Sequence, residues 1–307
     1  MCGISGFFSL NQTRRASELI QMSMDISHRG PDDEGFCLYS YGLDPEILSS
    51  KSTIPELKHK LINIEKRRDD RCTVGLAHRR FSIIDTSYLG HQPMRCDRSS
   101  NIIVFNGEVY NYIELRKELE GLGYCFKSNS DTEVVLTAYL HWGVECFSRF
   151  NGFWSIAILD VNARKLILSR DRFGKKQLYL LKDKDGFYFS SEIKPLLRLQ
   201  KNTSLNNRAA YFYLAHDRRD AYESSMFNGI DQVDRASYQV FDLDSGKCTK
   251  KKYWDINQIE QEEISEKKAS EKLDFLIPKY SIISLKYLSG NSPSYFFINF
   301  FPSSIDK

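Results

Sequence analysis

The chain has 307 residues, of which 41% are hydrophobic and 27% are charged, and its formal net charge at pH 7 is only +3. This composition is typical of a globular protein with one large or two modest domains. Because the basic residues are scattered, the charge does not predict binding to nucleic acid or to an anionic membrane, and no apolar run reaches the roughly 18 residues that a membrane span needs.

The cysteines and the N-terminus restrict the cellular setting. The start of the chain has no basic segment followed by an apolar one, so we expect no secretory signal. The seven cysteines form no close pairs and include no Cys-x-x-Cys, which predicts neither a disulfide framework nor a structural metal. We therefore expect a cytoplasmic protein without a metal site.

The predicted elements begin almost at the first residue. An apolar strand over Ile4–Leu10 precedes a helix over Arg15–Ile26, where apolar residues recur at helical spacing. A loop dense in turn-forming residues, His28–Gly35, leads into a strand over Phe36–Tyr41. Residues 42–72 are polar and in part highly charged, which predicts a surface insertion.

The next segments mix strands with helices. We expect strands over Thr73–Ala77 and Asn101–Phe105 and helices over Tyr112–Leu122 and Thr132–Trp142. Four short β-favouring runs with turn residues between them predict an antiparallel meander, over Phe153–Asp160, Lys165–Ser169, Gln177–Leu181 and Gly186–Ser190. Strands and helices that do not alternate regularly predict an α+β layered sandwich.

The character of the sequence changes after about Leu199. Residues 202–255 are polar, and residues 257–274 are charged and helix-prone. The tail from Pro278 onward contains bunched aromatic residues without a clear period and does not predict an organised domain.

Cys2 is the first residue with an interpretation in terms of chemistry. Methionine before a small side chain is normally removed, which would place a thiol and a free α-amino group on one residue. An α-amine with a reference pKa of about 7.7–8.0 is a usable base at neutral pH, as it is for N-terminal threonine nucleophiles. The alternative interpretation is an inert buried cysteine, so Cys2 needs further residues to support a catalytic role.

Those residues are present as motifs that resemble the class II glutamine amidotransferases, and specifically the glutaminase half of asparagine synthetase. Eight blocks occur in the order of that family: Met1–Gly6, His28–Asp32, GLAHRRFSIID at 75–85, His91–Met94, FNGEVYNYIELRKEL at 105–119, Ser130–Val134, GFWSIAILD at 152–160 and SRDRFGKKQLYL at 169–180. The resemblance covers residues 1 to about 200 and continues weakly to Trp254.

This resemblance implies a fold and an activity. The fold would be the αββα four-layer sandwich of N-terminal-nucleophile hydrolases, in which two antiparallel sheets are flanked by helices. The activity would be hydrolysis of L-glutamine to glutamate and ammonia through a γ-glutamyl thioester on Cys2, whose α-amine takes and then delivers the proton. No cofactor is expected in this chain, although full-length relatives use ATP and Mg²⁺.

The family supplies an oxyanion hole with an Asn side chain and a Gly backbone N–H, which match Asn106 and Gly107. The alternative for this pair is a tight turn, in which Asn-Gly is favoured.

The family also recognises the two charged ends of free glutamine. Arg80 matches the arginine that binds the substrate carboxylate, a role that suits a bidentate guanidinium, whereas its neighbour Arg79 would be a solvated surface charge. Asp131 matches the carboxylate that holds the substrate ammonium, and the alternative is a helix N-cap before Thr132.

Glu108 and the backbone of Ile83 and Ile84 complete the glutamine pocket that the resemblance implies. Arg29 would support the Cys2 end of the site. His28 would be structural, because an α-amine base removes the need for an imidazole.

Beyond Trp254 the resemblance breaks down in stages: residues 262–279 still resemble the family's next helix, whereas residues 280–307 look like sequence from a shifted reading frame. Full-length asparagine synthetases continue with an ATP pyrophosphatase domain that carries a Ser-Gly-Gly-x-Asp-Ser loop, whereas the tail here offers only Leu288–Ser292, without the second Gly and the Asp. We therefore expect a truncated or frameshifted synthetase. Its glutaminase domain would cover residues 1–200, a linker and incomplete start of the synthetase domain 201–279, and an irregular tail 280–307.

Two smaller departures from the family concern the insertion at 42–72 and Lys176-Gln177, where relatives usually carry Lys-Pro. Both suggest a divergent branch, such as one that amidates a sugar or peptide precursor.

Three hypotheses follow from the sequence. The first is an active glutaminase, working alone, as a homodimer or with a separate synthetase or acceptor subunit. The second is a catalytically idle remnant that serves as an interaction module. The third is another class II amidotransferase, which makes amino sugars or phosphoribosylamine, but the RRFSIID and FNGEVYN motifs speak against it.

Overall fold

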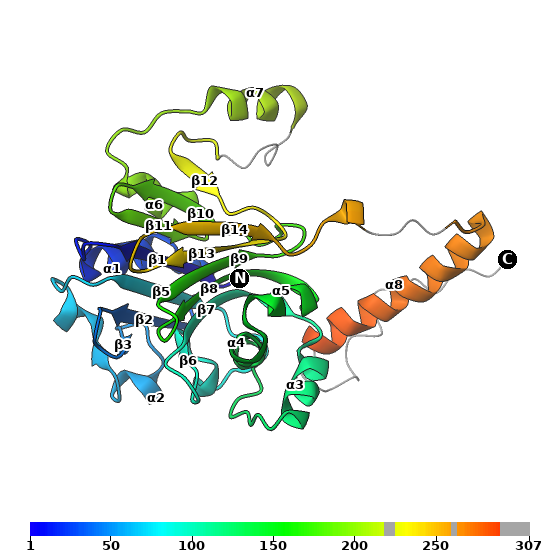
Figure 1. The fold of residues 1–307 in the computed structure, drawn as a ribbon, viewed down its shortest axis with the longest axis horizontal. Coiled ribbons are helices and arrows are strands. Elements are labelled where there is room, and N and C mark those ends of the chain that lie inside the picture. Colours follow the sequence, from blue (N-terminus) through cyan, green and yellow to red (C-terminus); the bar gives the residue numbers. More distant parts are fainter. Residues whose placement is uncertain (218–224, 259–262, 289–307) are drawn as a thin grey trace. The chain divides into compact units, whose positions relative to one another are not determined.

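The computed structural model describes residues 1–217, 225–258 and 263–288 (Figure 1). The chain forms two compact units, Met1–Asp255 and Ile256–Lys307. The second unit contains the short 3-10 turn η5 (Ile256–Gln258) and helix α8 (Glu266–Leu288). Of the tail that we expected to be irregular, residues 280–288 belong to α8, and the remainder, with Ser289–Ser292, lies outside the described residues.

The first unit is built on two sheets. The larger sheet has eight strands in the order β12 (Ile230–Gln232), β10 (Tyr179–Asp183), β11 (Gly186–Ser190), β1 (Gly3–Ser9), β5 (Val74–Arg80), β2 (Asp33–Tyr39), β3 (Glu46–Ser49) and β4 (Ile62–Asn63). The smaller sheet has six strands in the order β14 (Cys248–Lys252), β13 (Ser237–Asp242), β9 (Lys165–Arg170), β8 (Gly152–Asp160), β7 (Ile102–Val109) and β6 (Met94–Arg95). All neighbouring strands are antiparallel except β3 and β4.

Helices cover the outer faces of these sheets (Figure 1). Those that pack on the larger sheet are α1 (Ala16–Asp25) and α6 (Ile193–Leu199), and those that pack on the smaller sheet are α3 (Tyr112–Gly121), α4 (Asp131–Trp142) and α5 (Cys146–Arg149). The remaining helical segments are α2 (Pro55–Lys58), α7 (Asn207–His216), η1 (Ser27–Arg29), η2 (Ile64–Arg67), η3 (Tyr88–Gly90) and η4 (Gly143–Glu145). The expected αββα arrangement is confirmed.

The period-two pattern of the strands explains the layers. In β1, Ile4 and Phe8 point into the apolar core between the sheets, whereas Phe7 points to the opposite face and packs with α1. Strand β7 repeats the pattern, with Val104 in the core between the sheets and Phe105 beneath α3 and α4. Because both faces of these strands are buried, they read as continuous apolar runs.

Two expectations about the elements were wrong. The four runs between 153 and 190 form no single meander, because the β8–β9 hairpin belongs to the smaller sheet and the β10–β11 hairpin to the larger one. The segment 42–72 is more than a surface insertion: β3 and β4 extend the larger sheet, and Leu48 and Ile64 are buried in the core beneath α1. The apolar stretches of β3 and β4 are short and have many charged residues around them in the sequence, so no strand pattern was visible.

Residues 201–255, which we assigned to a linker region, supply strands to both sheets. Strand β12 pairs with β10, and β13 pairs with β9, so these segments complete the sandwich that the first 200 residues form. The unit Met1–Asp255 therefore extends well past residue 200.

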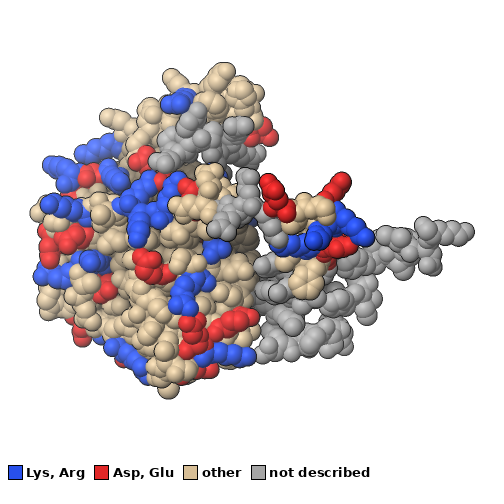
Figure 2. All heavy atoms as spheres, turned by 45° about the vertical axis from the view of Figure 1, so that its right-hand side comes forward, with Lys and Arg blue, Asp and Glu red and all other residues tan. Residues whose placement is uncertain are grey.

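The described residues also show whether the protein has membrane-spanning helices, disulfides or a surface of uniform charge. No helix among these residues is long and apolar enough to cross a bilayer. All seven cysteines are described, and all are free. On the face that Figure 2 shows, Lys and Arg side chains are interspersed with Asp and Glu.

Candidate active site

The two sheets bring four distant segments together at one end of β1. Strands β1 and β5 are antiparallel neighbours with Gly3 opposite Arg79, so Cys2 lies beside the residues that follow β5. The Phe81 N–H donates to Cys2 Sγ over 3.3 Å. This end of the larger sheet meets β7 of the smaller sheet and the start of α4 in one cavity.

That cavity, of about 70 Å³, contains every glutamine-site residue that the sequence predicted except Arg29. The residues that the sequence predicted and that line the cavity are Cys2, Arg80, Ile83, Ile84, Asn106, Gly107, Glu108 and Asp131. Met1 also lines it and is itself 65% exposed, so removal of Met1 would enlarge the space beside the Cys2 thiol.

Arg80 is buried and fixed from behind by backbone carbonyls. Its Nη1 donates to Ser87 O over 2.9 Å, and its Nη2 donates to Asp85 O. Gly90 makes this position available, because a Cβ there would lie 2.2 Å from Arg80 Nη2. A guanidinium held in this way is fixed at the wall of the cavity, so that pairing with a carboxylate there would cost little side-chain entropy.

Asn106 and Gly107 lie within β7 opposite Ser155 and Trp154, so the tight-turn alternative is wrong. Beyond Ile103, β7 has no partner strand on its other edge among the described residues. Backbone N–H groups of alternate residues point to that edge.

Two of these N–H groups have side-chain acceptors. The Phe105 N–H donates to Gln92 Oε1 over 2.7 Å, and the Val109 N–H donates to Asp131 Oδ2 over 3.1 Å. The period of two places the Gly107 N–H between them on the same edge, facing the cavity that Gly107 lines. Asn106 is 1% exposed, with Nδ2 3.4 Å from the hydroxyls of Ser155 and Ser191.

Asp131 is the first residue of α4, and the N-cap is Ser130, whose hydroxyl accepts from Thr132 N–H. The N-cap alternative for Asp131 is therefore wrong. Its carboxylate instead ties the start of α4 to the end of β7.

Arg79 is not a solvated charge, as we had expected. It is 6% exposed, pairs with Glu34 at 2.6 Å and donates to Ser23 O over 3.1 Å. Because side chains alternate along β5, Arg79 faces α1 while Arg80 faces the cavity. Period two therefore separates the neighbouring arginines into a structural and a site residue.

Arg29 lies behind the cavity and holds the backbone of Cys2. Its Nε donates to Cys2 O over 2.9 Å, and its Nη1 pairs with Glu192 at 3.0 Å. His28 Nε2 lies 2.8 Å from the same Glu192 carboxylate. The charges and hydrogen bonds of these two partners outweigh burial and hold the pKa of Glu192 below its ordinary value.

Burial raises the pKa of the Cys2 thiol, against the opposing effects of the Phe81 N–H, the chain terminus, Arg80 and Lys176. The thiol is therefore protonated at neutral pH, and its use as a nucleophile needs a base close by. No group of three or more His, Cys, Asp or Glu in the described part of the chain could hold a metal ion.

Several residues around the cavity were not predicted. Lys176 lines it, with Nζ 3.8 Å from Met1 Sδ, and Gln92 and Thr132 line its inner wall. All three stand inside the family motifs, so the signal was present without a role attached. Ser191 and Glu192 follow β11 outside every motif, and only the fold brings them to the site.

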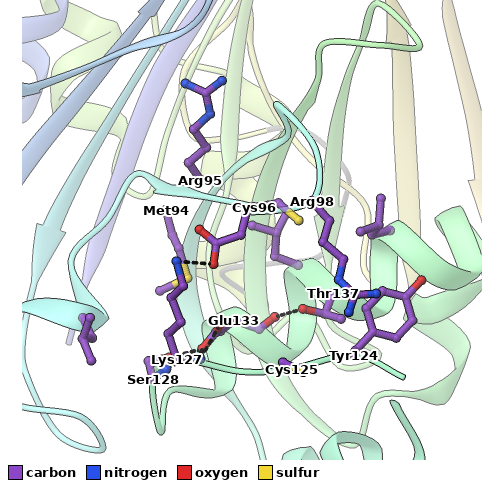
Figure 3. A pocket seen from close by; sticks show the side chains of 14 residues that line it. Met94, Arg95, Cys96, Arg98, Tyr124, Cys125, Lys127, Ser128, Glu133 and Thr137 are labelled. Atoms are coloured by element: carbon purple, nitrogen blue, oxygen red, sulfur yellow. Dashed lines mark hydrogen bonds and ion pairs between the residues drawn. The ribbon is translucent and has the colours of Figure 1, made fainter. Parts of the chain in front are cut away.

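A second cavity, of about 110 Å³, opens beside α4 (Figure 3). Lys127 Nζ pairs there with Asp97 at 2.7 Å, and Glu133 accepts from the N–H and hydroxyl of Ser128 at 2.7 and 2.6 Å (Figure 3). The charges of Lys127, Asp97 and Glu133 are thus paired within the protein, and none of the predicted glutamine-site residues lines this cavity.

In a comparison with known protein families, residues 53–254 match the family described as a glutamine amidotransferase domain. A similar curated protein is the putative asparagine synthetase (glutamine-hydrolyzing) 2 of Methanocaldococcus jannaschii, 31% identical over 273 residues that cover 83% of this chain and 47% of that protein. Asparagine synthetase (glutamine-hydrolyzing) 1 of Bacillus subtilis is 37% identical over 219 residues, which cover 70% of this chain and 29% of that protein. The chain thus spans less than half the length of these relatives.

Among solved structures, glutamine phosphoribosylpyrophosphate amidotransferase from B. subtilis superposes with a TM-score of 0.59 and 18% identity, covering 82% of this chain and 49% of that one. At this identity the likeness establishes the fold alone.

Proposed function

Because the chain belongs to the glutamine amidotransferase domain family, we propose that it hydrolyses L-glutamine with Cys2 as the N-terminal nucleophile after removal of Met1. The observation that carries this proposal is the single cavity that joins Cys2, Arg80, Asn106, Gly107 and Asp131. These residues supply a thiol, a guanidinium, an amide, a backbone N–H and a carboxylate, which are the groups that hydrolysis of a free amino-acid amide requires.

Binding comes first in the proposed mechanism. Arg80 pairs with the α-carboxylate of glutamine, and Asp131 pairs with its α-ammonium. Glu108 and the backbone of Ile83 and Ile84 contact the remainder of the substrate. These contacts hold the side-chain amide carbon against Cys2 Sγ.

Acylation follows. The α-amine of Cys2 takes the thiol proton while Sγ attacks the amide carbon, and the negative charge that develops on the amide oxygen is stabilised by Asn106 and the Gly107 N–H. The ammonium of Cys2 then gives its proton to the departing nitrogen. The C–N bond breaks, ammonia leaves, and the γ-glutamyl thioester remains on Cys2.

Deacylation uses the same groups. The α-amine takes a proton from water, which attacks the thioester carbon, and the same two donors stabilise the second oxyanion. Collapse breaks the C–S bond, the thiol recovers its proton, and glutamate leaves. This cycle uses only groups of the chain, so we expect no metal or cofactor for it.

The destination of the ammonia extends the proposal. The curated relatives are named asparagine synthetases, and this chain spans less than half of their length. We propose that the ammonia serves asparagine synthesis. The acceptor site would lie on a separate synthetase subunit, or the chain would work as a homodimer. Seven free cysteines are consistent with a reducing cytoplasm.

The test is glutamate release from L-glutamine by the purified protein, with and without ATP and aspartate, beside the Cys2→Ala variant. We expect release that is independent of ATP and absent in the variant. Equal release by both proteins would refute the role of Cys2, and no release by a Met1-free chain would favour an idle interaction module.

A further inference from the structure

Two residues that follow β11 contact both halves of the proposed catalytic apparatus. Ser191 Oγ accepts from Ile4 N–H over 3.0 Å and lies 3.4 Å from Asn106 Nδ2. Glu192, the next residue, pairs at 3.0 Å with Arg29, whose Nε holds Cys2 O. One dipeptide thus touches the segment that carries the nucleophile and the side chain of the oxyanion donor.

The hydrogen bonds of Asn106 define what Ser191 contributes. Asn106 Oδ1 is buried and has no partner, while Nδ2 lies near the hydroxyls of Ser155 and Ser191. The Ser191 oxygen already accepts from Ile4, so its own proton needs an acceptor, and an amide nitrogen is not one.

Oxygen and nitrogen of a carboxamide are assigned from their hydrogen-bond partners. The orientation that gives both hydroxyl protons an acceptor turns Asn106 Oδ1 toward Ser155 and Ser191. Both serines can then donate to it, and Nδ2 is left free to donate to an oxyanion in the cavity. In this arrangement Ser191 fixes the direction in which Asn106 donates.

Glu192 acts on Cys2 through Arg29. Arg29 has its Nε on Cys2 O, and its guanidinium can stay there only if its charge is paired, because it is largely withdrawn from water, with 15% of its side chain exposed. Glu192 supplies that charge and is itself oriented by His28. Its carboxylate therefore fixes, through Arg29, the backbone of the residue that carries both the thiol and the base.

We propose that Ser191 and Glu192 are positioning residues of the glutaminase. Together they fix the position of the oxyanion donor Asn106 relative to the nucleophile Cys2. This inference rests on the proposed function. Neither residue touches the substrate, so the loss of either lowers the rate of the chemical step more than it changes glutamine binding by Arg80 and Asp131.

Double-mutant cycles test the proposal, because a residue that acts through another has no effect once the other is gone. We expect Ser191→Ala and Glu192→Gln each to lower kcat about tenfold with a KM change below about twofold. In an Asn106→Ala background Ser191→Ala should cost less than about twofold further, and in an Arg29→Ala background the same should hold for Glu192→Gln.

Matched controls exist elsewhere in the fold. Ser169 is as buried as Ser191 and bonds to Trp154 and Ser237, so Ser169→Ala removes an equivalent hydroxyl away from the site. Asp25 pairs with Arg198 at 2.9 Å, so Asp25→Asn breaks a comparable ion pair. Both controls should lower thermal stability without changing kcat by more than about twofold. Equal losses in single and double backgrounds, or unchanged kcat in the single variants, would overturn the proposal.

An activity-independent measurement separates this inference from the proposed function. Ser191→Ala removes the acceptor of the Ile4 N–H, so amide hydrogen exchange at Ile4 should become at least about tenfold faster, whereas Ser169→Ala should leave it unchanged. Unchanged exchange in Ser191→Ala would overturn the positioning role even in a chain that released no glutamate. If the wild-type chain released no glutamate while Ser191→Ala still accelerated exchange at Ile4, the positioning would be supported and the proposed function alone refuted.

Discussion

Replacing Gly107 by alanine should damage the oxyanion site with a magnitude that the geometry sets. A Cβ at position 107 would lie 2.3 Å from Phe153 O and 2.6 Å from Trp154 Cα, whereas ordinary contacts begin at 3.4 Å. The first contact is therefore short by about 1.1 Å, and both obstacles are backbone atoms of the neighbouring strand. To accommodate the methyl group, β7 must move away from β8 by a distance of that order.

A displacement of about 1 Å in the catalytic groups can cost on the order of 100-fold in rate. We therefore expect Gly107→Ala to lower kcat for glutamine hydrolysis about 100-fold, with a smaller change in KM, because Arg80 and Asp131 belong to other elements. The assay is glutamate release at saturating glutamine, with the free energy of unfolding measured in parallel.

Gly121 offers the matched control, because nothing lies within 4 Å of a Cβ at that position. Gly121→Ala, at the end of α3, should leave kcat unchanged and raise the free energy of unfolding by roughly 0.5 kcal/mol. If Gly107→Ala folded cooperatively with wild-type kcat, β7 would not set the geometry of the oxyanion site, and the reasoning would be wrong.

Three further predictions concern substrate binding, the thiol and metals. Arg80→Lys keeps the charge but loses the guanidinium fork, so KM for glutamine should rise about tenfold to 100-fold with a smaller fall in kcat; an unchanged KM would remove Arg80 from the substrate site. Burial raises the pKa of Cys2 in the Met1-bearing protein, so its thiolate forms at higher pH than in the unfolded chain. Alkylation of Cys2 by iodoacetamide at pH 8 should then be slower in the folded protein, roughly tenfold for each unit of pKa, and should accelerate as the pH rises further; equal rates would contradict the buried thiol. Dialysis against EDTA should leave glutamate release unchanged, and a loss restored by Mg²⁺ or Zn²⁺ would show that the mechanism is incomplete.

Much of the fold could be predicted from local patterns. Period-two and helical spacing located β1, α1, α3 and α4 within a few residues, because their apolar faces are long and their neighbours in sequence contain clear turn residues. The distribution of strands between the sheets could not be predicted, because the β8–β9 and β10–β11 hairpins have the same local pattern and differ only in tertiary partner. Strand β12 was missed because it has only three residues, and β14 because it is exposed and polar. Strand β13 was missed because the buried polar residues Ser237 and Gln239 interrupt its apolar run.

The site shows the same division. Motifs identified Cys2, Arg80, Asn106, Gly107 and Asp131, which are close in space although more than 100 residues separate the first from the last. Patterns alone gave no means of separating Arg79 from Arg80, because that choice depends on which face of β5 meets the cavity.

Supporting residues were harder to find. Ser191 and Glu192 carry no recognisable motif, and their contacts with Asn106 and Arg29 depend on how β11 lies beside β1.

The most direct test of the N-terminal nucleophile compares the same protein before and after removal of Met1. Protein that retains Met1 should be treated with a methionine aminopeptidase while intact mass and glutamate release are followed together. We predict that the rate of glutamate release rises in proportion to the fraction of chains that begin at Cys2. Full activity in protein that still carries Met1 would contradict the account, because the Cys2 nitrogen would then be an amide without basic character.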